Sequence, residues 1–194
     1  MYIGNVCGIG HALYSKREQQ KKDHYETMVA SGISWTMTLL FMVLHDKYRF
    51  GRNRLKAVMD FFNTIDADGT QPQGFVLLWR DMLDANGFER MKTEYLAEKL
   101  RRALLDRERD KRCIVHTQDI IAGAMIVTAY CLYTVYGFRK KRLHDFQAYV
   151  SDLVYLVAKK EIPIWDFMEC LYRECGIEQD ILTEYKRIHG PIVI

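Results

Sequence analysis

The sequence has little of what marks several protein classes. It holds only 3 prolines among 194 residues and no low-complexity run, which excludes collagen-like and repetitive linker chains. Strand signals are almost absent, because the one β-branched run is Pro191-Ile-Val-Ile. Hydrophobic residues make up 49% of the chain and charged residues 27%, a balance that excludes intrinsic disorder. These features predict a folded chain built almost entirely from helices.

Cysteine is sparse and shows no metal or disulfide spacing. The five cysteines are Cys7, Cys113, Cys131, Cys170 and Cys175, an odd number with no C-x-x-C pair. This usage favours reduced thiols and a cytoplasmic location, and it argues against a structural zinc site. A secretory signal is not expected either, since no basic segment precedes the short apolar stretch near the N-terminus.

Two segments 88 residues apart share one motif. The first is LHDKYRFGRNRL, residues 44–55, and the second is LYTVYGFRKKRL, residues 132–143. Five of the twelve positions are identical, which gives the pattern L-x3-Y-x-F-x3-R-L in both. Because self-similarity at a fixed offset indicates an internal repeat, we expect two equivalent structural units.

The apolar spacing around each motif predicts three helices per unit. An apolar helix precedes the motif, an amphipathic helix follows it, and a third helix ends at Gly87 or Gly176. The outer helices are expected at Ser34–Lys47 and Phe75–Asn86 in the first unit, and at Ile120–Phe138 and Ile164–Cys175 in the second. The predicted fold class is all-α, with two pseudo-repeated three-helix units joined by a charged connector helix.

The chain is expected to divide into five parts. These are an N-terminal arm or separate helix (1–30, helical from about His11 to Met28), a first repeat (31–91), a charged connector helix (92–115), a second repeat (116–180) and a C-terminal tail (181–194). The connector is predicted as a solvated helix because charged residues fill all but a narrow apolar stripe between Lys92 and Arg112.

One segment has the length of a membrane span. Ile120–Phe138 has nineteen residues without a charge, and Arg139-Lys-Lys-Arg follows directly. Three tyrosines and two threonines weaken insertion, and the stretch taken as its counterpart, Ile33–Leu44, has only twelve residues. Since equivalent segments should play equivalent roles, we expect a buried core helix and no membrane partner.

Basic residues gather just after the aromatic pair of each motif. The candidate nucleic-acid or partner-binding residues are Lys47, Arg49, Arg52, Asn53, Arg54 and Lys56 in the first copy, and Arg139, Lys140, Lys141 and Arg142 in the second. Both clusters fall at a predicted helix start, where the helix dipole favours anions, so they could grip two stretches of phosphate. The Tyr-x-Phe residues before each cluster could stack on bases, or they could fill the corner between two helices while the cations are merely solvated.

The charge of the chain is polarised. Residues 161–185 contain seven acids and one base, Arg173, although the net charge of the whole chain is only +3. An acidic surface beside basic clusters can bind a basic protein as well as nucleic acid. Alternatively, the acidic region pairs internally with the basic clusters.

Signals for catalysis are poor. His45-Asp46 and His144-Asp145 are HD pairs of the kind found in metal-dependent phosphohydrolases, but they do not align in the repeat. No nucleophile or phosphate-loop motif occurs. We therefore expect no enzyme and no cofactor, and a metal-dependent phosphohydrolase is kept as an alternative.

The first copy of the motif resembles a motif of small helical proteins from phages and prophages of Firmicutes, L-H-D/E-x-F/Y-G-F-G-x-x-R-L. Leu44, His45, Asp46, Tyr48, Phe50, Gly51, Arg54 and Leu55 match it, and Arg49 departs where glycine is usual. Some such proteins resemble anti-CRISPR inhibitors, which implies binding to a Cas nuclease, its guide RNA or its target DNA.

The expected function is therefore that of a non-enzymatic, phage-derived protein that inhibits a nucleoprotein in the host bacterial cytoplasm, with a CRISPR–Cas9 effector as candidate target. A phage DNA-binding regulator or packaging accessory that uses the paired basic helix starts is the alternative.

Overall fold

A computed structural model describes the backbone of residues 6–67, 72–106 and 108–193 and the side chains of residues 18–64, 77, 79–106 and 108–193. This part of the chain contains helices and no strand, so the all-α class is confirmed. The helices are α1 (Val6–Tyr48), α2 (Arg52–Ala67), α3 (Pro72–Ala85), α4 (Arg90–Leu104), α5 (Lys111–Thr134), α6 (Lys140–Ala158), α7 (Ile164–Cys175) and α8 (Asp180–His189).

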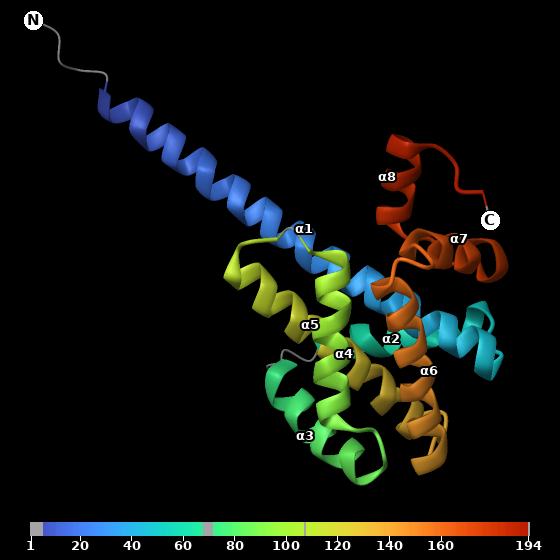
Figure 1. Ribbon diagram of the computed structural model, residues 1–194. Coiled ribbons are helices and arrows are strands. Elements are labelled where there is room, and N and C mark those ends of the chain that lie inside the picture. The colour runs from blue at the N-terminus through green and yellow to red at the C-terminus, as the bar shows by residue number, and fades with distance from the viewer. Residues whose placement is uncertain (1–5, 68–71, 107, 194) are drawn as a thin grey trace, which may run out of the picture.

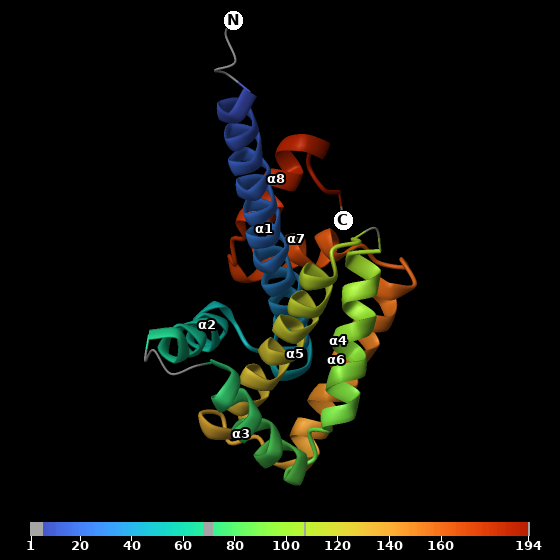
Figure 2. The same ribbon diagram turned by 90° about the vertical axis from the view of Figure 1, so that its left-hand side faces the viewer.

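The centre of the fold is the pair formed by α1 and α5, which pack against each other (Figure 1). The N-terminal part of α1 extends beyond the body of the protein, whereas its C-terminal part is buried among the other helices (Figures 1 and 2). Fully buried leucines such as Leu40, Leu44 and Leu132 fill the space between the helices. The buried apolar side chains belong to one continuous core.

Each helix of this pair is packed by helices from the opposite half of the chain. From the first half, α2 and α3 pack on α5, and from the second half, α6 and α7 pack on α1. Helix α4 packs on α5 and α6, and α8 packs on α7. Each half therefore completes its core only with helices from the other half.

The N-terminal region differs from its prediction. A break near residue 30 was expected between two helices, but α1 is continuous from Val6 to Tyr48. Gly32 does not end the helix, because it lies where α1 approaches α5 closely. A Cβ atom on Gly32 would come within 2.8 Å of the Thr117 methyl group, so this glycine serves packing.

The connector is shorter than predicted, and α5 begins earlier. Instead of one helix over residues 92–112, α4 ends at Leu104 and α5 begins at Lys111. The side chain of Asp110 caps α5 by accepting the Arg112 backbone N–H at 2.8 Å. This cap lies within a run of charged residues, where it gives no periodic signal.

The length comparison used against a membrane span is wrong. The first unit also has nineteen consecutive residues without Asp, Glu, Lys or Arg, from Thr27 to His45, rather than only residues 33–44. By length and apolar composition alone, Glu18–Tyr48 and Lys111–Thr134 could each cross a membrane. Of their most apolar windows, 61% and 50% are buried within the protein.

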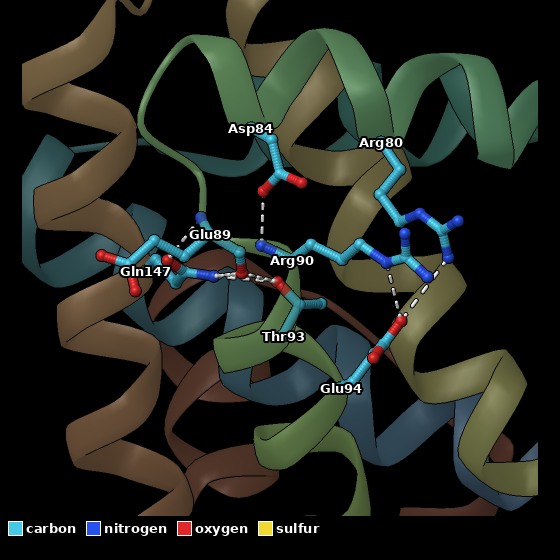
Figure 3. Close-up of polar contacts among 7 residues, drawn as sticks. All are labelled: Arg80, Asp84, Glu89, Arg90, Thr93, Glu94 and Gln147. Carbon is cyan, nitrogen blue, oxygen red and sulfur yellow. Dashed lines mark hydrogen bonds and ion pairs between the residues drawn. The ribbon is translucent and has the colours of Figure 1, made fainter.

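A buried glutamine fixes the turn between α3 and α4 to α6 (Figure 3). Gln147 donates to the Glu89 carbonyl at 2.7 Å and to the Thr93 hydroxyl oxygen at 2.8 Å, and it accepts the Glu89 N–H at 3.0 Å. The glycines predicted to end the third helices of the two units both have positive φ, +84° at Gly87 and +62° at Gly176.

Candidate nucleic-acid interface

The two copies of the motif form two helix–helix corners with the same backbone pattern. We call residues 44–55, between α1 and α2, corner one, and residues 132–143, between α5 and α6, corner two. The Phe50 N–H donates to the Leu44 carbonyl at 3.0 Å, and the Phe138 N–H donates to the Leu132 carbonyl at 2.9 Å. In both corners the phenylalanine N–H binds the carbonyl six residues earlier, so α1 and α5 end with the same hydrogen bond.

The corners also contact each other reciprocally. Tyr48 packs on Phe138 and Tyr136 packs on Phe50, with ring centroids 4.8 Å apart in both pairs and interplanar angles of 50° and 51°. The Tyr48 hydroxyl donates to the Arg142 carbonyl at 3.2 Å. The Tyr136 hydroxyl donates to the Arg54 carbonyl, the equivalent acceptor, at 3.3 Å. Corners one and two therefore contact each other in a reciprocal, two-fold-like manner.

These contacts explain why the motif residues are shared. Phe50 and Phe138 are only 2% and 1% exposed, so they fill the corners and are not available to stack on bases. The Arg54 guanidinium lies 5.4 Å from the Phe50 ring centre, and that of Arg142 lies 3.8 Å from Phe138. Both arginines therefore cover a buried ring as well as carrying charge.

The corners differ in how they satisfy one backbone carbonyl. In corner one, the Phe50 carbonyl oxygen lies 3.0 Å from Nδ1 of His45. In corner two, the equivalent carbonyl of Phe138 accepts from the Arg139 guanidinium at 3.1 Å, and the same group donates to the Tyr133 carbonyl at 3.0 Å. The cation of Arg139 therefore stabilises its own corner.

The second nitrogen of His45 joins corner one to α7. Nε2 of His45 lies 2.7 Å from the Glu174 carboxylate. Since both nitrogens face acceptors, this environment favours protonation of the ring. Burial lowers the pKa of His45, but hydrogen bonds to the Phe50 carbonyl and to Glu174 outweigh it, so this pKa is raised above 6.5. The hydrogen bond from His45 lowers the pKa of Glu174.

The hydroxyl of Tyr48 remains a donor over the whole physiological range. Burial, together with the nearby charge of Asp145, raises the pKa of Tyr48 to about 12. The hydrogen bond from Tyr48 to corner two therefore does not titrate near neutral pH.

All ten residues predicted to bind nucleic acid or a partner are exposed. They occupy the two corners and the first turns of α2 and α6, which the reciprocal contacts bring together. Their nine cations are Lys47, Arg49, Arg52, Arg54, Lys56, Arg139, Lys140, Lys141 and Arg142. Among the described residues, none of these nine forms an ion pair with a carboxylate.

The acidic region near the C-terminus pairs with other groups. Buried Glu169 binds Arg173 at 2.7 Å and also contacts Lys186, and Glu184 binds Arg187. Glu174 binds His45, whose ring is not one of the nine cations. Within the described part of the chain, this region therefore forms no direct ion pair with the nine cations.

One constellation was not found from the sequence. Sγ of Cys175 lies 3.3 Å from Nδ1 of His45, whose Nε2 binds Glu174, so a thiol, an imidazole and a carboxylate stand in line. This order resembles a nucleophile, base and orienting acid. The signal is distributed over residues 45, 174 and 175, so no local motif reveals it.

The surroundings of this constellation do not favour a nucleophile. Cys175 is only 4% exposed, and burial raises the pKa of its thiol, with the charges of Glu174 and Asp46 adding to the effect. The N–H groups of Gly176 and Ile177 that could stabilise an oxyanion already donate to α7 carbonyls. Over the described residues, no three His, Cys, Asp or Glu side chains are grouped to hold a metal ion. The described cysteines, Cys113, Cys131, Cys170 and Cys175, are free thiols.

No protein-family model, curated protein or solved structure matches this chain.

Proposed function

We propose that the paired corners bind the phosphate backbone of nucleic acid. The observation that carries the proposal is the set of nine exposed cations without a carboxylate partner, held side by side by the reciprocal tyrosine contacts. Arginine and lysine side chains with no internal partner bind polyanions mainly by releasing their counterions. Elsewhere on the protein, cations such as Arg90, Arg102 and Arg187 pair with nearby glutamates.

The finer architecture belongs to the same proposal. We take the chain as two pseudo-repeated three-helix units, α1–α3 and α5–α7, with α4 as the charged connector. The shared motif and the exchange of helices between the halves support this division. Duplication then supplies two equivalent basic clusters at a fixed spacing, which one unit alone would lack.

The biological role we propose is inhibition of a nucleoprotein by a non-enzymatic protein of phage origin, acting in the host cytoplasm. The candidate target is a CRISPR–Cas9 effector with its guide RNA. The resemblance of residues 44–55 to a phage motif supports this target. The nine cations supply contacts to RNA or DNA, and the acidic surface of α7 and α8 supplies contacts to a basic protein.

A second candidate is a phage DNA-binding regulator or packaging accessory. The reciprocal, two-fold-like contact of the corners favours it, because the two strands of a DNA duplex are themselves related by two-fold axes. This candidate uses the same cations on duplex DNA, without a protein partner.

Direct binding is tested with three lysines whose side chains do not stabilise the corners. In a triple variant, Lys56, Lys140 and Lys141 are replaced by alanine, and affinity for a labelled 20-base-pair duplex is measured by fluorescence anisotropy as a function of salt. The slope of log K against log salt should become shallower by about 2–3, because each lost phosphate contact removes roughly 0.9. A matched variant with alanine at Arg109, Lys111 and Arg112 loses the same charge away from the corners, and it should keep the wild-type slope.

The absence of wild-type binding to duplex DNA and to single-stranded RNA at 50 mM salt, about the low end of the usual range, would contradict the nucleic-acid proposal. The inhibitor role is tested separately by adding the protein to Cas9 loaded with guide RNA and measuring target cleavage. Unchanged cleavage with several Cas9 orthologues, together with duplex binding, would favour the regulator.

A further inference from the structure

Arg49 occupies a backbone conformation that its counterpart reserves for glycine. Its φ is +58°, and that of the equivalent Gly137 is +66°. A side chain in this left-handed region crowds its own backbone, so arginine is less stable there than glycine. Corner two achieves the same turn without this cost. The less stable backbone at Arg49 therefore raises the question of what its side chain does in corner one.

Two positions later the residue types are reversed. Corner one has Gly51, where an added Cβ atom would have no other atom within 4 Å, whereas corner two has Arg139. Glycine is possible at position 51 because His45 already satisfies the Phe50 carbonyl, the task that Arg139 performs in corner two. Corner two thus has its arginine at position 139, where it binds backbone carbonyls, whereas corner one has an exposed arginine two positions earlier in the motif, at position 49.

With arginine at position 49 and glycine at position 51, corner one has an open pocket. The pocket has a volume of about 330 Å³ and is lined by Arg49, Gly51, Arg52, Asn53 and Arg54, with no carboxylate in the lining. Arg54 is placed over the Phe50 ring, and the Arg52 guanidinium lies against Gly176 at the end of α7, 3.5 Å from where a Cβ would stand. Arg49 is exposed, and no hydrogen bond or ion pair to another described residue is assigned to its side chain.

We propose that this pocket binds one phosphate group of the nucleic-acid backbone, and that Arg49 is its specificity-determining residue. Three guanidinium groups and the NH2 group of the Asn53 amide are available as donors to an anion at this place, and guanidinium forks match phosphate oxygens in pairs. The inference rests on the proposed function, and it adds that the two corners are unequal: corner one holds a phosphate in a shallow, open depression lined by arginines, and corner two contributes charge alone.

The decisive variant is Arg49→Gly, which restores the glycine of corner two. Melting temperature and affinity for the labelled 20-base-pair duplex are measured side by side. We expect the melting temperature to rise by about 2–4 °C, because the strained arginine is removed. We expect affinity at 100 mM salt to fall roughly tenfold, because a bidentate phosphate contact is lost.

The matched control is Lys141→Ala in corner two, which removes one charge without changing strain. It should weaken duplex binding only about threefold and leave the melting temperature unchanged. Arg49→Lys keeps the charge and the strained backbone but lacks the fork, so it should bind more weakly than wild type with an unchanged melting temperature.

The outcomes separate this inference from the proposal beneath it. If the wild type binds duplex and Arg49→Gly loses no more affinity than Lys141→Ala, the pocket is not a phosphate site, although the nucleic-acid proposal stands. A fall in the melting temperature of Arg49→Gly would show that Arg49 supports the fold, which overturns the inference as well. If poly-glutamate displaces the duplex at a lower concentration of charge than unlabelled duplex does, the pocket recognises an acidic protein. If the wild type does not bind nucleic acid, both proposals fail together.

Discussion

Corner one and corner two have the same backbone conformation but use their cations differently. Corner two places Arg139 on two backbone carbonyls and keeps glycine at the turn. In corner one, His45 contacts the equivalent carbonyl, and the exposed Arg49 occupies the turn. The same backbone turn therefore occurs once with glycine and once with an arginine in a less stable backbone conformation.

The same contrast extends to the helices that follow the corners. In α6, Gln147 is 1% exposed because α4 covers it, whereas the equivalent position of α2, Met59, is 42% exposed. The second helix of each unit thus begins in the same way but has a different environment along its length. At this position, one turn beyond the corners, the environments of α2 and α6 therefore differ.

The largest expected effect tests what the corners share. Phe50→Ala and Phe138→Ala should each lower the free energy of unfolding by about 3–5 kcal/mol, because each removes a fully buried ring at equivalent places. The two losses are measured by urea denaturation, and they should agree within about 1 kcal/mol. Val135→Ala, at a site that is 60% exposed, serves as the control and should change stability by less than about 0.5 kcal/mol. A loss under 1 kcal/mol for only one phenylalanine would show that the corners are not equivalent.

The next effect tests where the two halves diverge. Gln147→Met, which introduces the counterpart residue of α2, should cost about 1–3 kcal/mol, because the Glu89 N–H and carbonyl lose their buried partner. The reverse change, Met59→Gln, should cost less than about 0.5 kcal/mol, since that side chain is already largely in water. Equal losses in urea denaturation would mean that α2 and α6 have the same environment in solution.

Much of the fold follows from local sequence signals. Periodicity and the C-terminal glycines predicted α7 at Ile164–Cys175 with its end at Gly176, as observed. Helix starts without a periodic signal were missed, such as the Asp110 cap of α5. The continuity of α1 was missed because the segment before residue 30 was interpreted as a separate arm or helix, and only packing shows that Gly32 lies inside one helix close to Thr117. Packing between distant segments, which the sequence does not display, decided these cases.

In the candidate site, too, some features could be predicted from local sequence and others depend on contacts between distant segments. The ten basic and amide residues were predicted as exposed binding residues from composition and position, and all ten are exposed. The aromatic residues could not be assigned to base stacking or to the core from the sequence, because the contact of Tyr48 with Phe138 joins residues 90 positions apart. His45 was singled out for its HD pair, but its partners, the Phe50 carbonyl and Glu174, depend on the corner and on α7.

The third effect is a pH dependence confined to corner one. His45 has a pKa raised above its ordinary 6.5, so its contribution to stability is complete below about pH 6.5 and is lost as the pH rises through the folded value. Glu174 has a pKa lowered from 4.5, so its contribution is present above that value and is lost on acidification. The pair should therefore stabilise the protein most between these two values.

The size of this effect is about 1 kcal/mol, because Glu174 is 56% exposed and water screens the pair. The free energy of unfolding is measured between pH 5.5 and 8.5, roughly the range in which histidine titrates. His45→Gln should flatten the decline toward alkaline pH, and His144→Gln, an exposed histidine in the other half, should not. An unchanged pH profile in His45→Gln would show that the imidazolium does not hold corner one.

The smallest effect tests the reciprocal hydroxyl contacts. Tyr48→Phe and Tyr136→Phe each remove one hydrogen bond, to the Arg142 and the Arg54 carbonyl respectively, and keep the ring packing. The bonds are long, at 3.2 and 3.3 Å, and their acceptors belong to exposed residues, so each loss should be about 0.5–1 kcal/mol. The two values should agree within about 0.5 kcal/mol in urea denaturation, and Tyr172→Phe on the exposed face of α7 supplies the baseline. Agreement would confine the asymmetry of the corners to His45, Arg49 and Gly51, whereas a clear difference would show that it reaches the tyrosines that join them.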